Sequence, residues 1–125
     1  MTIRLPLALA ASLMFGLALA SPVLAHAELL SEVPAANAKL SAPLPTALTL
    51  TFSEALELSF TKIVVKGPDG TALDTGALQL STDGKTVTIK LSQTPLPEGK
   101  VTIEWTAVAT DGHKTKGSYT FSVAN

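Results

Sequence analysis

The feature that most restricts the fold is a strict alternation of apolar and polar residues in short segments. In residues 101–109, for example, Val101, Ile103 and Trp105 alternate with threonine and glutamate. Such a period of two places the apolar side chains on one face of a β-strand. The alternation occurs in residues 47–52, 86–91, 101–109 and 114–123. Turn signals separate the β-prone segments: Gly-Pro-Asp-Gly at 67–70, Asp-Gly at 83–84 and Pro-Leu-Pro-Glu-Gly at 95–99.

These patterns predict an all-β domain without a convincing helix. We expect about seven strands, at residues 26–32, 47–52, 60–66, 77–80, 86–91, 101–109 and 114–123. Residues 34–46 contain three prolines and are expected to form an extended loop, and residues 53–57 a bulge or a helical turn. Short strands at regular spacing are typical of a seven-stranded Greek-key sandwich or small barrel of the immunoglobulin-like type. Trp105 and Phe121 are expected in its core.

The first 25 residues have the three parts of a secretory signal peptide. Arg4 gives a positive start, residues 5–20 are almost entirely apolar, and Val23-Leu24-Ala25 offers small residues for cleavage. A retained membrane anchor is the alternative, although the apolar run is short of the roughly 20 residues that a span needs. We therefore expect a signal peptide at residues 1–25 and a domain at residues 26–125, exported to a bacterial periplasm.

Composition excludes several classes of site. The chain has no cysteine, so disulfides, thiolate metal sites and cysteine nucleophiles are excluded. Both methionines, Met1 and Met14, lie in the leader, so the mature chain has no soft ligand for monovalent copper. The net charge of −1 and the few aromatic residues argue against a nucleic-acid partner.

Cleavage after Ala25 would create an unusual metal ligand. His26 would become the first residue, with a free α-amine beside its own imidazole, and the pair could chelate one ion. The only other histidine, His113, stands two residues after Asp111. Three nitrogens and one carboxylate oxygen suit a tetragonal Cu(II) site. We expect Glu54, where a strand ends, either to support this site from nearby or to be simply solvated.

The same residues resemble the CopC family of periplasmic copper-binding proteins. The resemblance rests on residues 26–35 as a mature start, on Thr-Leu-Thr-Phe-Ser-Glu at 49–54, and on residues 99–121 with Trp105, Asp-Gly-His and Gly117. It implies a seven-stranded Greek-key β-barrel that binds Cu(II) through His26, Asp111 and His113. Some family members carry a methionine-rich Cu(I) site, which this sequence lacks. Ala55-Leu56 replaces the Pro-Val that often follows Glu54 in the family.

We therefore expect a non-enzymatic Cu(II) protein for copper trafficking, storage or resistance. Its expected partners are a membrane copper transporter or another periplasmic copper protein. One alternative is a polysaccharide monooxygenase, because such enzymes also bind copper through a terminal and a second histidine. The small chain without an aromatic sugar-binding platform argues against that alternative. The other is an immunoglobulin-like adhesion or chaperone module with incidental histidines, whose melting temperature would not depend on metal.

Overall fold

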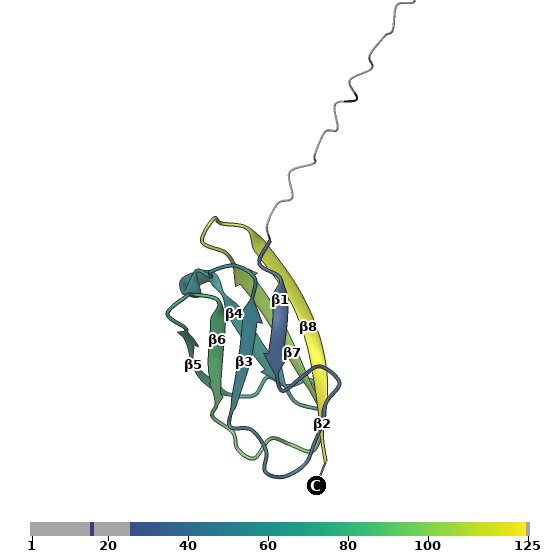
Figure 1. Cartoon of the computed structure of the whole chain (residues 1–125). Helices are drawn as coiled ribbons and strands as arrows, with labels where there is room; N and C mark the ends of the chain where they lie inside the picture. Colours follow the sequence, from purple (N-terminus) through teal and green to yellow (C-terminus); the bar gives the residue numbers. More distant parts are fainter. Residues whose placement is uncertain (1–15, 17–25, 125) are drawn as a thin grey trace, which may run out of the picture.

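The computed structural model describes Gly16 and residues 26–124, in which strands follow one another with almost no helix (Figure 1). The predicted signal peptide, apart from Gly16, lies outside the described residues, so its cleavage stays a prediction. The elements are β1 Leu29–Val33, β2 Lys39–Leu40, β3 Ala47–Phe52, the 3-10 turn η1 Leu58–Phe60, β4 Lys62–Lys66, β5 Thr75–Leu80, β6 Thr86–Leu91, β7 Gly99–Val108 and β8 Lys114–Val123. In the described part of the chain, no helix is long and apolar enough to cross a membrane.

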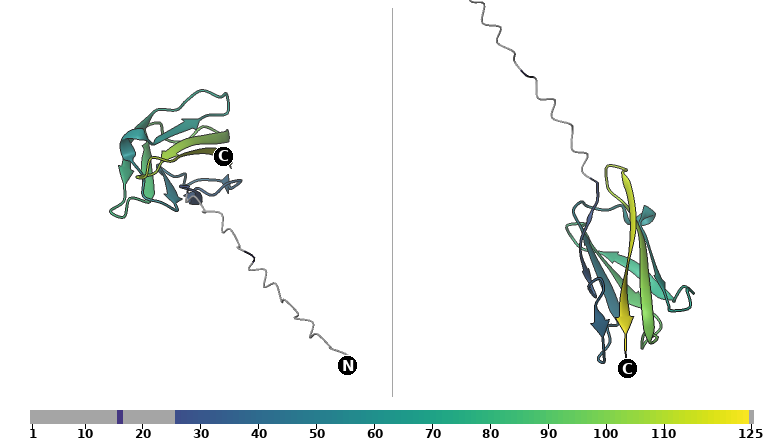
Figure 2. Two further views of the ribbon diagram at one scale, coloured as in Figure 1. Left: turned by 90° about the horizontal axis from the view of Figure 1, so that it is seen from above. Right: turned by 90° about the vertical axis from the view of Figure 1, so that its right-hand side faces the viewer.

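The strands form two four-stranded sheets that pack face to face (Figure 2). The strand order is β1-β3-β6-β5 in the first sheet and β2-β8-β7-β4 in the second. All neighbours are antiparallel except β2 and β8, which run parallel over two residue pairs. The expected all-β sandwich of Greek-key type is therefore confirmed.

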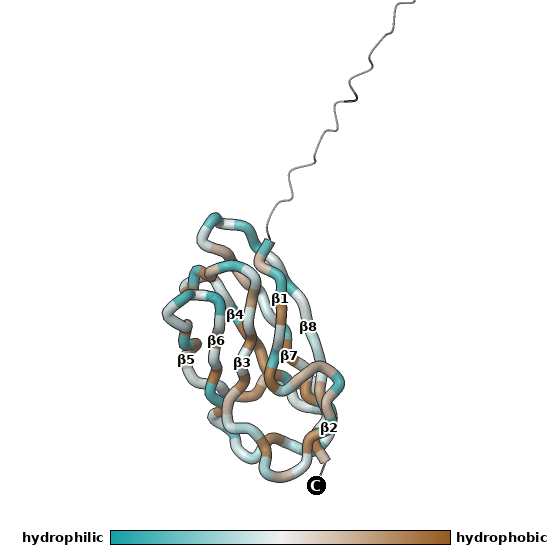
Figure 3. The backbone as a smooth tube through the Cα atoms, in the orientation of Figure 1, coloured by the Kyte–Doolittle hydropathy of each residue, from teal (hydrophilic) through white to brown (hydrophobic). Residues whose placement is uncertain are grey.

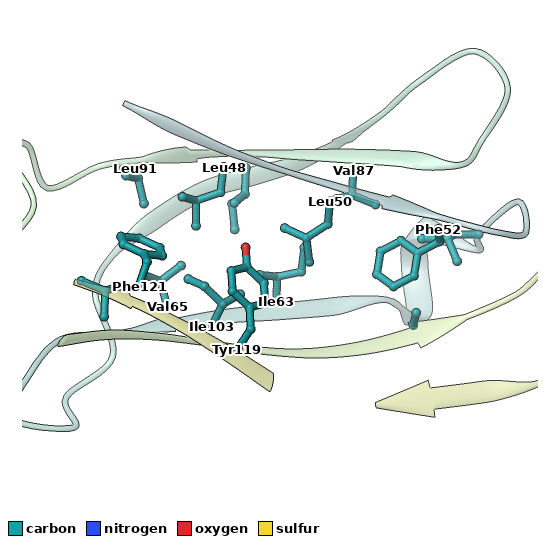
Figure 4. Packing of buried hydrophobic residues seen from close by; sticks show 14 of the residues in the cluster. Leu48, Leu50, Phe52, Ile63, Val65, Val87, Leu91, Ile103, Tyr119 and Phe121 are labelled. Atoms are coloured by element: carbon teal, nitrogen blue, oxygen red, sulfur yellow. The ribbon is translucent and has the colours of Figure 1, made fainter. Parts of the chain in front are cut away.

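The alternating pattern decides which side chains fill the space between the sheets. In β3, Leu48, Leu50 and Phe52 have no exposed surface, whereas the threonines between them are half-buried. The facing strands of the second sheet contribute Ile103 and Phe121, so the interior is almost entirely apolar (Figure 4). Burying each such side chain stabilises the fold by roughly 1.5–3 kcal/mol relative to leaving it in water.

Trp105 closes one region of this core. Its ring makes an edge-to-face contact with Phe52, with centroids 5.2 Å apart, and is itself only partly buried. Gly117 lies opposite Trp105 in the β7–β8 pairing. A Cβ atom at Gly117 would lie 2.6 Å from Cζ2 of Trp105, so only glycine leaves room for the ring.

Several predicted boundaries differ from the structure. The first strand begins at Leu29 instead of residue 26, and β5 begins at Thr75 instead of residue 77. The predicted loop at residues 34–46 contains the short strand β2, so the described chain has eight strands. Its two residues pair with the end of β8, more than eighty positions later, and a local pattern carries no signal for such a contact.

The segment between β3 and β4 also differs. Residues 53–57 were predicted to form a bulge or a helical turn. The helical turn is η1, which begins directly after them, and Leu56 forms an isolated bridge with Ala109. Phe60, predicted to start a strand, belongs to this turn and is 69% exposed. Aromatic residues favour strands, but here the backbone bonds from residues 60 and 61 to Glu57 decide the local conformation.

Candidate metal centre

The two histidines lie at the same end of the sandwich although 87 positions separate them in the sequence. Figure 1 shows the start of the described chain beside the loop that joins β7 and β8. The ring centroids of His26 and His113 are 5.4 Å apart and the rings are nearly perpendicular, at 89°. Both side chains are exposed. In Figure 3, the tip of the loop and the start of the described domain at this end carry the colour of hydrophilic residues.

The loop that carries His113, residues 109–113 (the histidine loop), is closed by its own backbone. The N–H of Ala109 donates to the carbonyl of His113 at 2.9 Å, and the N–H of Gly112 donates to the carbonyl of Ala109 at 2.8 Å. Gly112 has a φ of 91°, which side-chain-bearing residues rarely adopt. The loop thus presents Asp111 and His113 together at the end of the long β7–β8 hairpin.

Asp111 directs both of its carboxylate oxygens to His113. Oδ1 accepts the backbone N–H of His113 at 3.0 Å, and Oδ2 lies 2.9 Å from its ring Nδ1. These hydrogen bonds, the one from the backbone first, hold the pKa of the Asp111 carboxyl below its usual value, with smaller contributions from the charges of His113 and His26. Because Nδ1 is occupied, Nε2 is the ring nitrogen of His113 that remains open to a ligand.

Residues 26–28, the N-terminal arm, are fixed by side chains from both sheets. Ala27 is fully buried in the core, and the Thr115 hydroxyl donates to its carbonyl at 2.6 Å. The Ser53 hydroxyl donates to the carbonyl of His26 at 3.0 Å and accepts the N–H of Glu28 at 2.9 Å. Sequence reasoning missed Ser53 and Thr115, since a single hydroxyl residue carries no local signal for a partner so far along the chain.

Glu54 lies at the same end of the molecule. It stands between Ser53, which bonds to the N-terminal arm, and Ala55, whose carbonyl accepts the N–H of Thr110 in the histidine loop. Its side chain is half-buried and makes no hydrogen bond or ion pair with another described residue. Glu54 therefore takes no direct part in the contact between the two histidines.

Within residues 26–124, no three side chains of His, Asp or Glu are already arranged to hold a metal ion. Asp111 directs its carboxylate to the backbone N–H and the ring of His113. The remaining predicted donor, the backbone nitrogen of His26, is an amide in the full chain and not a side-chain donor. What the described side chains provide is two neighbouring imidazoles, one of them oriented by a carboxylate.

The fold and this end of the molecule define a β-sandwich with a candidate two-histidine metal centre formed by His26 and the histidine loop. Residues 29–124 match the CopC domain. Protein YobA of Escherichia coli (strain K12) is 43% identical over 102 residues, which cover 81% of each chain. Copper resistance protein C of Escherichia coli is 34% identical over 107 residues, 80% of this chain and 82% of that protein.

A solved structure supports the same family assignment as these sequence relatives. The crystal structure of PcoC, described as a methionine-rich copper resistance protein from Escherichia coli, superposes with a TM-score of 0.68 at 30% identity. The superposed region covers 80% of this chain and 100% of the PcoC chain. The chain belongs to the CopC family.

Proposed function

We propose that the mature chain, beginning at His26, is a periplasmic Cu(II)-binding protein that acts in copper trafficking, storage or resistance. The observation that carries this proposal is the 5.4 Å approach of the His26 and His113 rings. Family membership, and relatives named for copper resistance, support copper as the cargo. A membrane copper transporter or another periplasmic copper protein is the proposed partner.

In this proposal His26 supplies its α-amine and its ring Nδ1, and His113 supplies Nε2. Asp111 holds the His113 ring in the copper-free chain and completes the site with a carboxylate oxygen when the ion is bound. Carboxylates that orient metal-binding imidazoles usually matter for affinity as well. Glu54, between the two segments that meet here, is proposed to support the site from nearby.

The donor set favours divalent copper. Amine and imidazole nitrogens bind Cu(II) more tightly than the other divalent first-row ions. Monovalent copper prefers thiolates and thioethers, and residues 26–125 contain neither cysteine nor methionine. This sets the chain apart from PcoC, which is described as methionine-rich. We therefore propose one Cu(II) site and no transfer to a second, Cu(I) site.

The test compares two preparations, one that begins at His26 and one that keeps Ala25 before it. The extra residue turns the α-amine into an amide, so tight Cu(II) binding should be lost while the circular dichroism spectrum stays the same. Copper titration with electron paramagnetic resonance measures both the affinity and the nitrogen ligands. Equal affinities and identical spectra would remove the amine from the site.

Two further measurements belong to the same experiment. Copper must displace protons from the amine and the imidazoles, so affinity for the form that begins at His26 should rise between about pH 6 and pH 8. Peroxide production with ascorbate should stay at the level of free copper controls or below. Rapid peroxide production together with polysaccharide cleavage would instead identify an oxidative enzyme.

A further inference from the structure

We propose that Ser53 and Thr115 are positioning residues that hold the N-terminal arm in place before copper arrives, so that His26 already faces His113. This inference rests on the proposed function and adds to it a preformed site built by two hydroxyl groups that are not themselves ligands. The arm consists of residues 26–28, which precede β1.

The buried Ala27 and Thr115 anchor the arm to the second sheet. Ala27 is part of the hydrophobic core with no exposed surface, whereas His26 before it and Glu28 after it are exposed. The hydroxyl of Thr115 donates to the Ala27 carbonyl at 2.6 Å. Thr115 is two residues after His113 and the second residue of β8. One short segment therefore carries both a candidate ligand and the group that fixes the arm opposite it.

Ser53 anchors the arm to the first sheet. Its backbone N–H donates to the carbonyl of Glu28 at 2.8 Å, which extends the β1–β3 pairing past its last named pair, Leu29 with Phe52. Its hydroxyl also bonds on either side of Ala27, donating to the His26 carbonyl at 3.0 Å and accepting the Glu28 N–H at 2.9 Å. These contacts fix the backbone on both sides of the buried alanine.

Anchoring matters because the free end of a chain is otherwise the most mobile part of a domain. If His26 moved freely, copper binding would have to order its backbone and side chain, and this cost would be subtracted from the affinity. With Ser53 and Thr115 in place, the backbone of His26 is set in the copper-free protein, and only its ring has to turn toward the ion. The two hydroxyls should therefore raise affinity without changing the ligands.

The experiment uses protein that begins at His26, with the variants Ser53→Ala, Thr115→Val and the double variant. Thr115→Ser keeps the hydroxyl and serves as the rescue. Thr86→Val is the matched control, because it removes a hydroxyl that bonds only to Thr51 within the first sheet. Hydrogen exchange at the Glu28 amide is measured without copper, and Cu(II) affinity is measured by competition with a chelator.

Loss of either hydroxyl should speed exchange at the Glu28 amide and lower Cu(II) affinity roughly tenfold. In the double variant, Cu(II) affinity should fall by up to about a hundredfold. Thr115→Ser and Thr86→Val should match the wild type. The electron paramagnetic resonance spectrum of bound copper should keep the same nitrogen ligands in every variant, which a loss of ligands or of the fold would not allow.

The outcomes separate this inference from the proposed function. If the wild type binds Cu(II) tightly and the double variant binds equally well, the positioning role is wrong and the copper site stands. If the wild type itself fails to bind, the proposed function is wrong and the inference fails with it. An equal loss of affinity in Thr86→Val would also overturn the inference, because the effect would then come from general destabilisation.

Discussion

The interior of the sandwich and its histidine-bearing end are held together by different forces. The interior consists of side chains such as Leu50, Phe52 and Ile103 with no exposed surface, and its stability comes from removing apolar area from water. The end is built mostly from exposed residues that are fixed by hydrogen bonds, such as the two between Asp111 and His113. Ala27 joins the two regions, since it is buried in the core directly after His26.

This difference means that folding and copper binding should respond to different mutations. A truncation in the interior leaves a cavity and lowers the free energy of unfolding. A truncation among exposed polar residues removes little stability, because water replaces the lost hydrogen bond. The site can therefore be altered without unfolding the protein.

The largest effect is expected for Phe52→Ala. This change removes a fully buried ring that contacts Trp105 and lies in the strand paired with β1. It should lower the free energy of unfolding by about 3–5 kcal/mol, measured by urea denaturation. Thr49→Ala, a half-buried change in the same strand, is the control. A loss below about 1 kcal/mol for Phe52→Ala would show that the core is not the main source of stability.

His113→Ala should abolish tight binding and leave the fold intact. The side chain is about half exposed, so the free energy of unfolding should change by less than about 0.5 kcal/mol. Cu(II) affinity should fall about a hundredfold or more, since loss of a direct ligand should cost at least as much as loss of a supporting residue. Lys114→Ala, at the neighbouring exposed position, should bind copper normally. Wild-type affinity in His113→Ala would exclude this histidine from the site.

Gly117→Ala tests the border between the two regions. The new methyl group would meet the Trp105 ring at 2.6 Å, so the ring has to move away from its contact with Phe52. We expect a loss of about 1–3 kcal/mol in the free energy of unfolding and a change in tryptophan fluorescence. Gly76→Ala, where the nearest atom would lie 3.6 Å away, should cost less.

The smallest effect is expected for Tyr119→Phe. The Tyr119 hydroxyl points into the apolar interior and is the only buried side-chain polar atom without a hydrogen-bond partner in the described residues (Figure 4). Burial raises the pKa of this phenol above its usual value, with a smaller contribution from Glu32. Removing the hydroxyl should stabilise the protein by about 1 kcal/mol, seen as a higher melting temperature. A clear loss of stability would mean that the hydroxyl has a partner, such as a buried water.

The sequence predicted the fold class and the position of most strands because apolar residues recur at every second position in them. Strands such as β6 and β8 begin and end as predicted. Residues 26–28 and Phe60 were predicted as strand residues but lie outside the strands. The Ser53 and Thr115 hydroxyls bond to the carbonyls of His26 and Ala27, and backbone bonds to Glu57 place Phe60 in a turn. For the site, the sequence supplied His26, Asp111 and His113 as candidates, and their role as ligands stays a prediction.

The sequence alone determined which residue types are available: two histidines, no cysteine, no methionine after Met14, and side chains that alternate between a buried and an exposed face. The tertiary structure decided which of them meet. Hydrogen bonds that span 25 residues to Ser53 and 88 residues to Thr115 place the N-terminal arm beside the histidine loop. Periodicity acts over a few residues, whereas such contacts depend on how whole strands align and on how the two sheets pack.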